Sequence, residues 1–264
     1  MTFLEWLLGK YPNSPVNGQW GPLHITVLVL SIGMIVGLYF LLRKRSTRTK
    51  RIMVLSMVSV LILFEIVRRV INLYNETIFD LHNVLRILLP RPMCAIAVFV
   101  VIIAHFVNKP SVYNFASFTA ILATGIFWVY PGAGFRQYIL FDDLYSIVTH
   151  AFAFMIAISF ITLGFTKFEY KTIWKSVIYY VICIVWSLIL AFGLKIESDP
   201  MYFLPGNEIQ HDILGMDYAL YLPLYILFTI VFINSFYLIG DRKSVKSALQ
   251  KLGRNGKKTS KSAT

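Results

Sequence analysis

Cys94 is the residue whose type and position best suit covalent chemistry. It follows two prolines in LLPRPMCAIAVF, residues 88–99, where an apolar run begins. Proline is tolerated in the first helical turn and restricts the residue before it, so Pro90 and Pro92 predict a helix start just ahead of the cysteine. Free amide hydrogens and the positive end of the helix dipole favour a thiolate there, and Arg91 adds positive potential. The same amides can donate to a tetrahedral oxyanion.

His150, in LYSIVTHAFAFM, is the candidate general base. The apolar runs that hold Cys94 and His150 are predicted to enter the membrane from the same side, which brings the thiol and the imidazole to comparable depths. An imidazole at that depth can accept the thiol proton. The alternative is that both side chains only pack within a helix bundle, as Cys183 in VIYYVICIVWSL is expected to do.

Three charged residues lie in the apolar run 52–74: Glu65, Arg68 and Arg69. An ionisable side chain inside a membrane span is costly unless it is paired or faces a cavity. Glu65 can pair with either arginine, at i,i+3 or i,i+4. The remaining guanidinium has a fork geometry that suits a phosphate. The alternative is that the three charges neutralise one another and only hold helices together.

His24, in WGPLHITV, lies near the outer end of the first apolar run and completes the candidate substrate-binding set. The full set is Arg68, Arg69, Arg91, His24 and Glu65. No metal site is expected, because His24, His150, Cys94 and His211 stand singly, without the short ligand spacing of a zinc site. The chemistry also requires no soluble cofactor.

The elements that must position these residues are apolar runs long enough to cross a membrane. The 264 residues are 57% hydrophobic and 14% charged. A bilayer core of roughly 30 Å takes about 20 apolar residues in helical form. The sequence therefore predicts an all-α polytopic membrane bundle of about seven transmembrane helices. The predicted spans are roughly 22–42, 52–74, 90–107, 113–131, 143–165, 174–195 and 216–239.

Basic residues gather at 43–51, at 167–175 and in the tail, within a net charge of +12. The positive-inside rule puts these segments in the cytoplasm, so we expect the N-terminus outside the plasma membrane and the C-terminus inside. We interpret the charge as membrane-related and expect no nucleic-acid partner. The predicted domains are a seven-helix membrane domain, 1–239, and a basic disordered cytoplasmic tail, 240–264.

Two predicted outer segments are more than linkers. In ETIFDLHNVLRILL, 76–89, apolar residues recur at helical spacing opposite a polar face, as expected of a helix lying in the membrane interface. The segment 196–218 is acidic and mixes apolar residues with turn formers. It fits either a cap over the outer end of the bundle or an exposed loop.

The order and spacing of LLPRPMC, LYSIVTHAFAFM and DPMYFLPGNEIQHDILGMDYALYLPLYI resemble a known family. The likeness, over roughly 20–239, is to the bacterial YwaF-like integral membrane proteins and their eukaryotic relative, transmembrane protein 164. It implies a cysteine acyltransferase that moves a fatty acyl chain between phospholipids through an acyl-thioester. Cys94 matches the nucleophile and His150 the base. Relatives commonly carry a histidine beside or two residues before the cysteine, where this chain has Arg91, Pro92 and Met93.

The leading functional hypothesis is a membrane-embedded acyltransferase, or a lipase if water is the acceptor. Its partners would be membrane lipids in the outer leaflet, with a lysolipid or a lipoprotein as acceptor. The alternative is a non-catalytic binding or transport component for an anionic small molecule. A retinal-type receptor is disfavoured, because the last span has no lysine for a Schiff base. The oligomeric state stays open.

Overall fold

The computed structural model describes residues 3–8, 20–129, 135, 139–196, 199, 201–207 and 209–241, and this part of the chain is helical without strands. The all-α prediction is therefore confirmed. The α-helices are α1 (Phe3–Leu8), α2 (Pro22–Leu42), α3 (Thr47–Tyr74), α4 (Leu81–Leu88), α5 (Met93–Val107), α6 (Pro110–Val129), α7 (Phe141–Thr162), α8 (Ile173–Leu188) and α9 (Tyr218–Gly240). Short helical turns at Tyr170–Thr172, Ile189–Gly193 and Ile209–Ile213 complete the elements.

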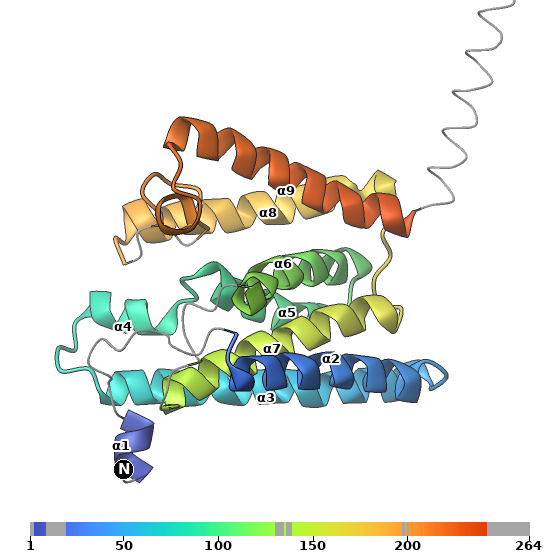
Figure 1. The fold of residues 1–264 in the computed structure, drawn as a ribbon, viewed down its shortest axis with the longest axis horizontal. Helices are drawn as coiled ribbons and strands as arrows, with labels where there is room; N and C mark the ends of the chain where they lie inside the picture. Colours follow the sequence, from blue (N-terminus) through green and yellow to red (C-terminus); the bar gives the residue numbers. More distant parts are fainter. Residues whose placement is uncertain are drawn as a thin grey trace, which may run out of the picture.

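The long helices form three layers (Figure 1). Helices α5 and α6 lie in the middle, α2, α3 and α7 cover one side, and α8 and α9 lie on the other. Small residues of α6, among them Ala116, Ser117 and Ala120, are fully buried and let α5 and α7 approach closely. The largest buried cluster draws on α3 and on α5 through α9, and Cys183 of α8 packs into it as expected.

Within the described residues, five helices are long and apolar enough to cross a membrane: α2, α6, α7, the stretch Tyr170–Gly193 and α9. A sixth span is possible if α4 and α5 are taken together as one bent element. Helix α3 has 28 residues but carries Glu65, Arg68 and Arg69 within its apolar part. The chain is thus an integral membrane protein by its helices, and the predicted count of seven spans is not confirmed.

The expected outer helix is α4, which is shorter than the predicted range 76–89. Asp80 caps it by accepting a hydrogen bond from the backbone N–H of Asn83 at 2.7 Å. The chain then bends by 64° into α5, across a break that holds both prolines. The Trp186 indole donates to the carbonyl of Pro90 at 3.1 Å, so α8 of the neighbouring layer fixes this bend.

The segment that precedes α9 folds back onto it as a cap. Three α9 tyrosines donate hydrogen bonds to its backbone: Tyr218 to Phe203 at 3.1 Å, Tyr221 to Tyr202 at 2.5 Å and Tyr225 to Met201 at 2.9 Å. Met201 is buried with 1% of its surface exposed. The described residues of 196–218 thus pack on α9 as a cap, and the placing of this cap on the outer side of the membrane stays a prediction.

The predicted tail boundary falls at the end of α9, which reaches Gly240. Residues 242–264 lie outside the described part of the chain. The predicted disorder of the tail, and the placing of the tail in the cytoplasm, stay predictions.

Candidate functional site

The first turn of α5 holds Cys94. Pro92 is the N-cap, and its carbonyl accepts the hydrogen bond of the Ile96 N–H group at 3.0 Å. Cys94 is therefore the second helical residue, where backbone N–H groups have no acceptor within the helix. The predicted helix start at the cysteine is confirmed, and Cys94 is a partly exposed free thiol.

Cys94 opens onto a cavity of about 290 Å³ between α3, α5 and α7. Arg68 of α3 and His150 of α7 line the same cavity, so helices far apart in sequence bring the predicted nucleophile, base and phosphate-binding cation to one space. The remaining lining residues are Pro92, Ala95, Val98, Asp142, Asp143, Tyr145, Ser146 and Thr149.

The imidazole of His150 is held by two contacts. Its Nδ1 lies 2.7 Å from the Ser146 carbonyl, which accepts a hydrogen only if Nδ1 carries one. The ring also stacks on Phe127 with centroids 4.1 Å apart and planes 18° apart. This tautomer leaves the lone pair on Nε2, which has no hydrogen-bond partner among the described residues. In this tautomer, Nε2 of His150 can accept a proton.

Of the two arginines in α3, Glu65 pairs with Arg69. Its carboxylate is buried, with 4% of the residue surface exposed. One oxygen accepts from the Tyr145 hydroxyl at 2.5 Å, and the other pairs with Arg69 Nη1. Arg69 also donates to the carbonyl of Leu88 at 3.1 Å. Glu65, Tyr145 and Arg69 together tie α3 to α7 and to α4.

Arg68 is the arginine that remains for the cavity. Its guanidinium lies over the Tyr145 ring at 4.4 Å, and its Nε is 3.8 Å from the Asp142 carboxylate. Asp142 is 67% exposed, so this ion pair is weak. The buried Nε has no hydrogen-bond partner within the described chain. Arg68 can therefore bind an incoming anion without giving up a strong internal partner.

The other predicted binding residues do not line this cavity. Arg69 and Glu65 form, with Tyr145, the hydrogen-bonded group that joins α3 to α7 and α4, here called the charged clamp. Arg91 lies between α4 and α5. His24 is fully buried at the start of α2, where its Nδ1 accepts from the Trp20 N–H group at 3.0 Å. Its ring is 4.5 Å from Phe135. The substrate-binding roles assigned to these four residues stay predictions.

Sequence reasoning missed the residues that orient the site. Ser146 stands four positions before His150, a spacing from which its carbonyl contact could have been inferred. Tyr145 gives no such signal, because a tyrosine in an apolar helix more often only packs. Its role depends on the approach of α3, which local sequence does not encode. Among the described residues, no three His, Cys, Asp or Glu side chains come together as metal ligands.

One protein-family model matches nearly the whole helical region of the chain. The model of the TMEM164 family matches residues 19–239, a stretch that runs from just before α2 to the last turn of α9. It contains Cys94, His150 and Arg68. No curated protein and no solved structure matches the chain. Because the family match covers well over half of the sequence, the resemblance to transmembrane protein 164 is confirmed, and the chain belongs to the TMEM164 family.

Proposed function

We propose that this protein is a membrane-embedded acyltransferase that moves a fatty acyl chain from a phospholipid through a thioester on Cys94. The observation that carries the proposal is the shared cavity of Cys94, His150 and Arg68. Family membership supports it, because the resemblance implies a cysteine acyltransferase. The predicted topology would put this cavity on the outer side of the plasma membrane.

The first half-reaction forms the acyl-enzyme. His150 Nε2 takes the Cys94 proton as the sulfur attacks the ester carbonyl carbon of the donor. The tetrahedral oxyanion would be stabilised by N–H groups of the first α5 turn, which have no acceptor within the helix. The ester C–O bond then breaks. The leaving alkoxide of the lysophospholipid receives the proton from His150.

The second half-reaction runs the same proton path in reverse. The hydroxyl of a lysolipid, or the amine of a lipoprotein, gives a proton to His150 Nε2 and attacks the thioester carbonyl. The C–S bond breaks, and the Cys94 sulfur takes the proton back. If water enters instead, the product is a free fatty acid and the enzyme acts as a lipase. No cofactor takes part in either half-reaction.

Arg68 would bind the headgroup phosphate of the donor. A guanidinium binds phosphate through paired N–H groups, and the position of Arg68 over the Tyr145 ring directs it to the cavity. This contact would fix which ester carbonyl reaches Cys94.

Intact-mass measurement tests the nucleophile directly. Purified protein is incubated with dioleoylphosphatidylcholine vesicles, and its intact mass is measured by mass spectrometry before and after treatment with hydroxylamine. We expect a single oleoyl adduct that maps to Cys94, is removed by hydroxylamine and is absent from Cys94→Ala. The matched control is Cys183→Ala, which should keep the adduct because Cys183 packs in the core. A Cys94→Ala protein that keeps both adduct and activity would refute the proposal.

A second candidate function is the non-catalytic binding or transport of an anionic small molecule. The observation that favours it is the placement of Arg68, with its weak Asp142 partner, on the cavity wall. It predicts that Cys94→Ser leaves function intact while Arg68→Gln abolishes it. Acyl transfer predicts that both variants lose activity.

A further inference from the structure

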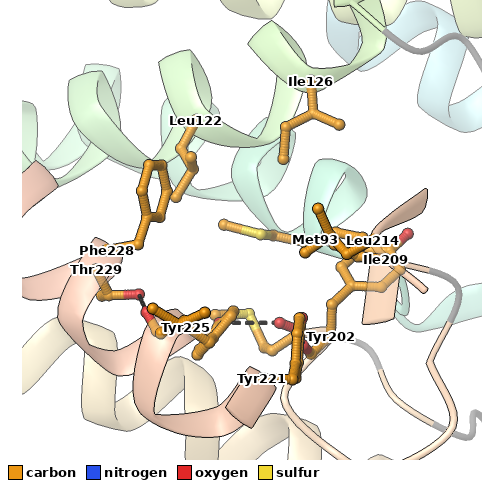
Figure 2. Close-up of a pocket in the computed structure, with 12 residues that line it drawn as sticks. Met93, Leu122, Ile126, Tyr202, Ile209, Leu214, Tyr221, Tyr225, Phe228 and Thr229 are labelled. Carbon is orange, nitrogen blue, oxygen red and sulfur yellow. Dashed lines mark hydrogen bonds between the residues drawn. The ribbon is translucent and has the colours of Figure 1, made fainter. Parts of the chain in front are cut away.

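A second cavity, of about 260 Å³, lies between α6, α9 and the cap segment. Figure 2 shows Leu122 and Ile126 of α6 facing Tyr221 and Tyr225 of α9, with the Met93 side chain between them. The rest of the lining is Met201, Tyr202, Ile209, Leu214, Leu224, Phe228 and Thr229. None of these side chains carries a charge.

Three hydroxyl groups of the wall, those of Tyr221, Tyr225 and Thr229, are already hydrogen bonded within the protein. Tyr225 donates to the Met201 carbonyl at 2.9 Å and shares a hydrogen bond of 2.7 Å with Tyr180. Tyr221 donates to the Tyr202 carbonyl at 2.5 Å, and Thr229 to the Tyr225 carbonyl at 2.9 Å. An occupant therefore meets carbon surface. Water needs several polar partners, whereas cavities of this kind stay dry and take up hydrocarbon.

The cavity lining combines exposed side chains, here called the rim, with buried side chains, here called the floor. Phe228, Leu214 and Leu224 at the rim are 53%, 50% and 42% exposed. Met93 and Met201 at the floor are 5% and 1% exposed. Because α6 and α9 are both long and apolar enough to span a membrane, the rim opens toward lipid and the floor reaches the middle layer of the bundle.

The floor ends at the residue next to the candidate nucleophile. Met93 and Cys94 are the first two residues of α5, and Met93 lines the apolar cavity while Cys94 lines the polar one. The start of α5 thus separates a hydrocarbon-type space from a space that holds a thiol, an imidazole and a guanidinium. A lipid has the same division, between its acyl chains and its ester and phosphate groups.

We propose that the cavity between α6, α9 and the cap binds the acyl chain of the lipid substrate, which enters sideways from the bilayer over Leu224 and Phe228. The identification of the occupant as the substrate chain rests on the proposed acyl transfer. Occupation of the cavity by a hydrocarbon chain can be measured separately.

Photolabelling tests the occupation. The full-length protein is reconstituted in dioleoylphosphatidylcholine vesicles that contain a phosphatidylcholine with a diazirine at the end of one acyl chain. After illumination, the labelled residues are mapped by peptide mass spectrometry. Surface lipid can reach exposed α9 residues such as Leu227, which is 56% exposed, but not Met93, Met201 or Tyr221. We expect label on these buried residues, and label confined to exposed positions would overturn the proposal.

Two blocking variants and one matched control sharpen this test. Leu224→Trp at the rim and Leu122→Trp on α6 should each reduce the buried label several-fold. Leu227→Trp, one turn from Leu224 on the same helix but off the cavity lining, should leave it unchanged. Thermal unfolding in detergent verifies that each variant is folded. Equal labelling in folded Leu224→Trp and Leu227→Trp proteins would contradict a chain entering at this rim.

The outcome is separable from that of the acyl-transfer proposal. Cys94→Ala should lose the oleoyl adduct yet keep the photolabel on Met201. An adduct on Cys94 without buried label would overturn the cavity assignment and leave acyl transfer standing. Buried label without any Cys94 adduct would support the hydrocarbon site and refute acyl transfer.

Discussion

At the scale of single residues, the two histidines near the cavity region differ in what their ring nitrogens can do. His150 lines the cavity, and its Nδ1 lies 2.7 Å from the Ser146 carbonyl, which leaves Nε2 without a hydrogen-bond partner among the described residues. His24 accepts at Nδ1 from a backbone N–H group and lies buried among aromatic rings, off the cavity lining. Under the proposed acyl transfer, His150 is the histidine that lines the cavity and would carry the proton, and His24 is not.

His150→Gln should slow the acylation of Cys94 by about 10²- to 10⁴-fold, the usual contribution of a general base. Glutamine keeps a side chain of similar polarity but cannot accept the thiol proton. The measurement is the rate of oleoyl adduct formation at saturating vesicle concentration. The control is His24→Gln, which should stay within a few-fold of the unsubstituted protein. Equal losses in both variants would remove the distinction between the histidines.

Arg69→Gln should destabilise the protein, whereas Arg68→Gln should not. Removing Arg69 leaves the buried Glu65 carboxylate without its cation, a loss that in other proteins costs about 3 to 5 kcal/mol. Among the described residues, the acidic partner of Arg68 is the exposed Asp142. Thermal unfolding in detergent measures the difference, and lipid KM should rise only for Arg68→Gln. The hypothesis fails if Arg68→Gln is the less stable variant.

From the sequence we predict that Glu65 pairs with one of the two arginines, Arg68 or Arg69, but the sequence does not show which one. Both spacings from Glu65 allow a pair on an isolated helix. The choice comes from Tyr145, which approaches from α7 and fixes one carboxylate oxygen at 2.5 Å. Contacts between helices that are 80 residues apart in sequence follow from packing, and a single sequence does not reveal them.

At the scale of elements, the prolines were the most informative signal for where a helix begins. Pro90 and Pro92 predicted the start of α5, because proline restricts the preceding residue and cannot donate within a helix. The start of α4 was placed too early, at 76 in place of 81. The Asp80 side chain caps the helix there and ends the preceding extended stretch. Because a helix cap is a local interaction, Asp80 could have been recognised from the sequence as the residue that caps α4.

Asp199→Asn should stabilise the cap at neutral pH. Burial raises the pKa of the Asp199 carboxyl above its ordinary value. One oxygen accepts the Leu204 N–H at 2.8 Å, while Oδ1 has no partner among the described residues. A raised folded-state pKa means that folding disfavours the carboxylate, so stability falls as pH rises from the unfolded pKa of about 4 through the folded one. Asparagine keeps an acceptor for Leu204 and carries no charge.

Unfolding temperatures of both proteins between pH 3 and pH 8 provide the measurement. The advantage of Asp199→Asn should be largest above the folded-state pKa and should shrink toward acid pH, where Asp199 is protonated. Asp199→Ala serves as the control, because it removes the charge and the Leu204 contact together and should lose stability at acid pH. An advantage that grows toward low pH would contradict the assignment.

At the scale of the whole molecule, hydropathy predicted the helical class and most helix ranges. Long apolar runs must become helices in a bilayer, since each backbone group needs an internal partner there. Hydropathy did not fix the number of spans, because two of the predicted spans meet the length and composition criteria only in part. Helix α3 carries three charges in its apolar part, and α5 is only 15 residues long. Composition alone does not decide whether such elements cross.

Helix α3 should cross the membrane, with the basic loop before it inside and the α4 segment outside. Its 28 residues extend about 42 Å at 1.5 Å per residue, more than a bilayer core of roughly 30 Å. Two of the three charges in its apolar part, Glu65 and Arg69, form an ion pair, which lowers the cost of burial, and Arg68 lies near Asp142 of α7. Two exposed positions, Lys44 and Thr77, flank the helix and suit single-cysteine labelling.

In a background with Cys94 and Cys183 replaced by alanine, Thr77→Cys should react with a membrane-impermeant maleimide on intact cells. Lys44→Cys should react only after permeabilisation, because the positive-inside rule puts the 43–51 loop in the cytoplasm. The reverse pattern would invert the topology and move the Cys94 cavity to the inner leaflet. Reaction of both cysteines on intact cells would mean that α3 does not cross, and that the charged clamp lies at one surface of the membrane.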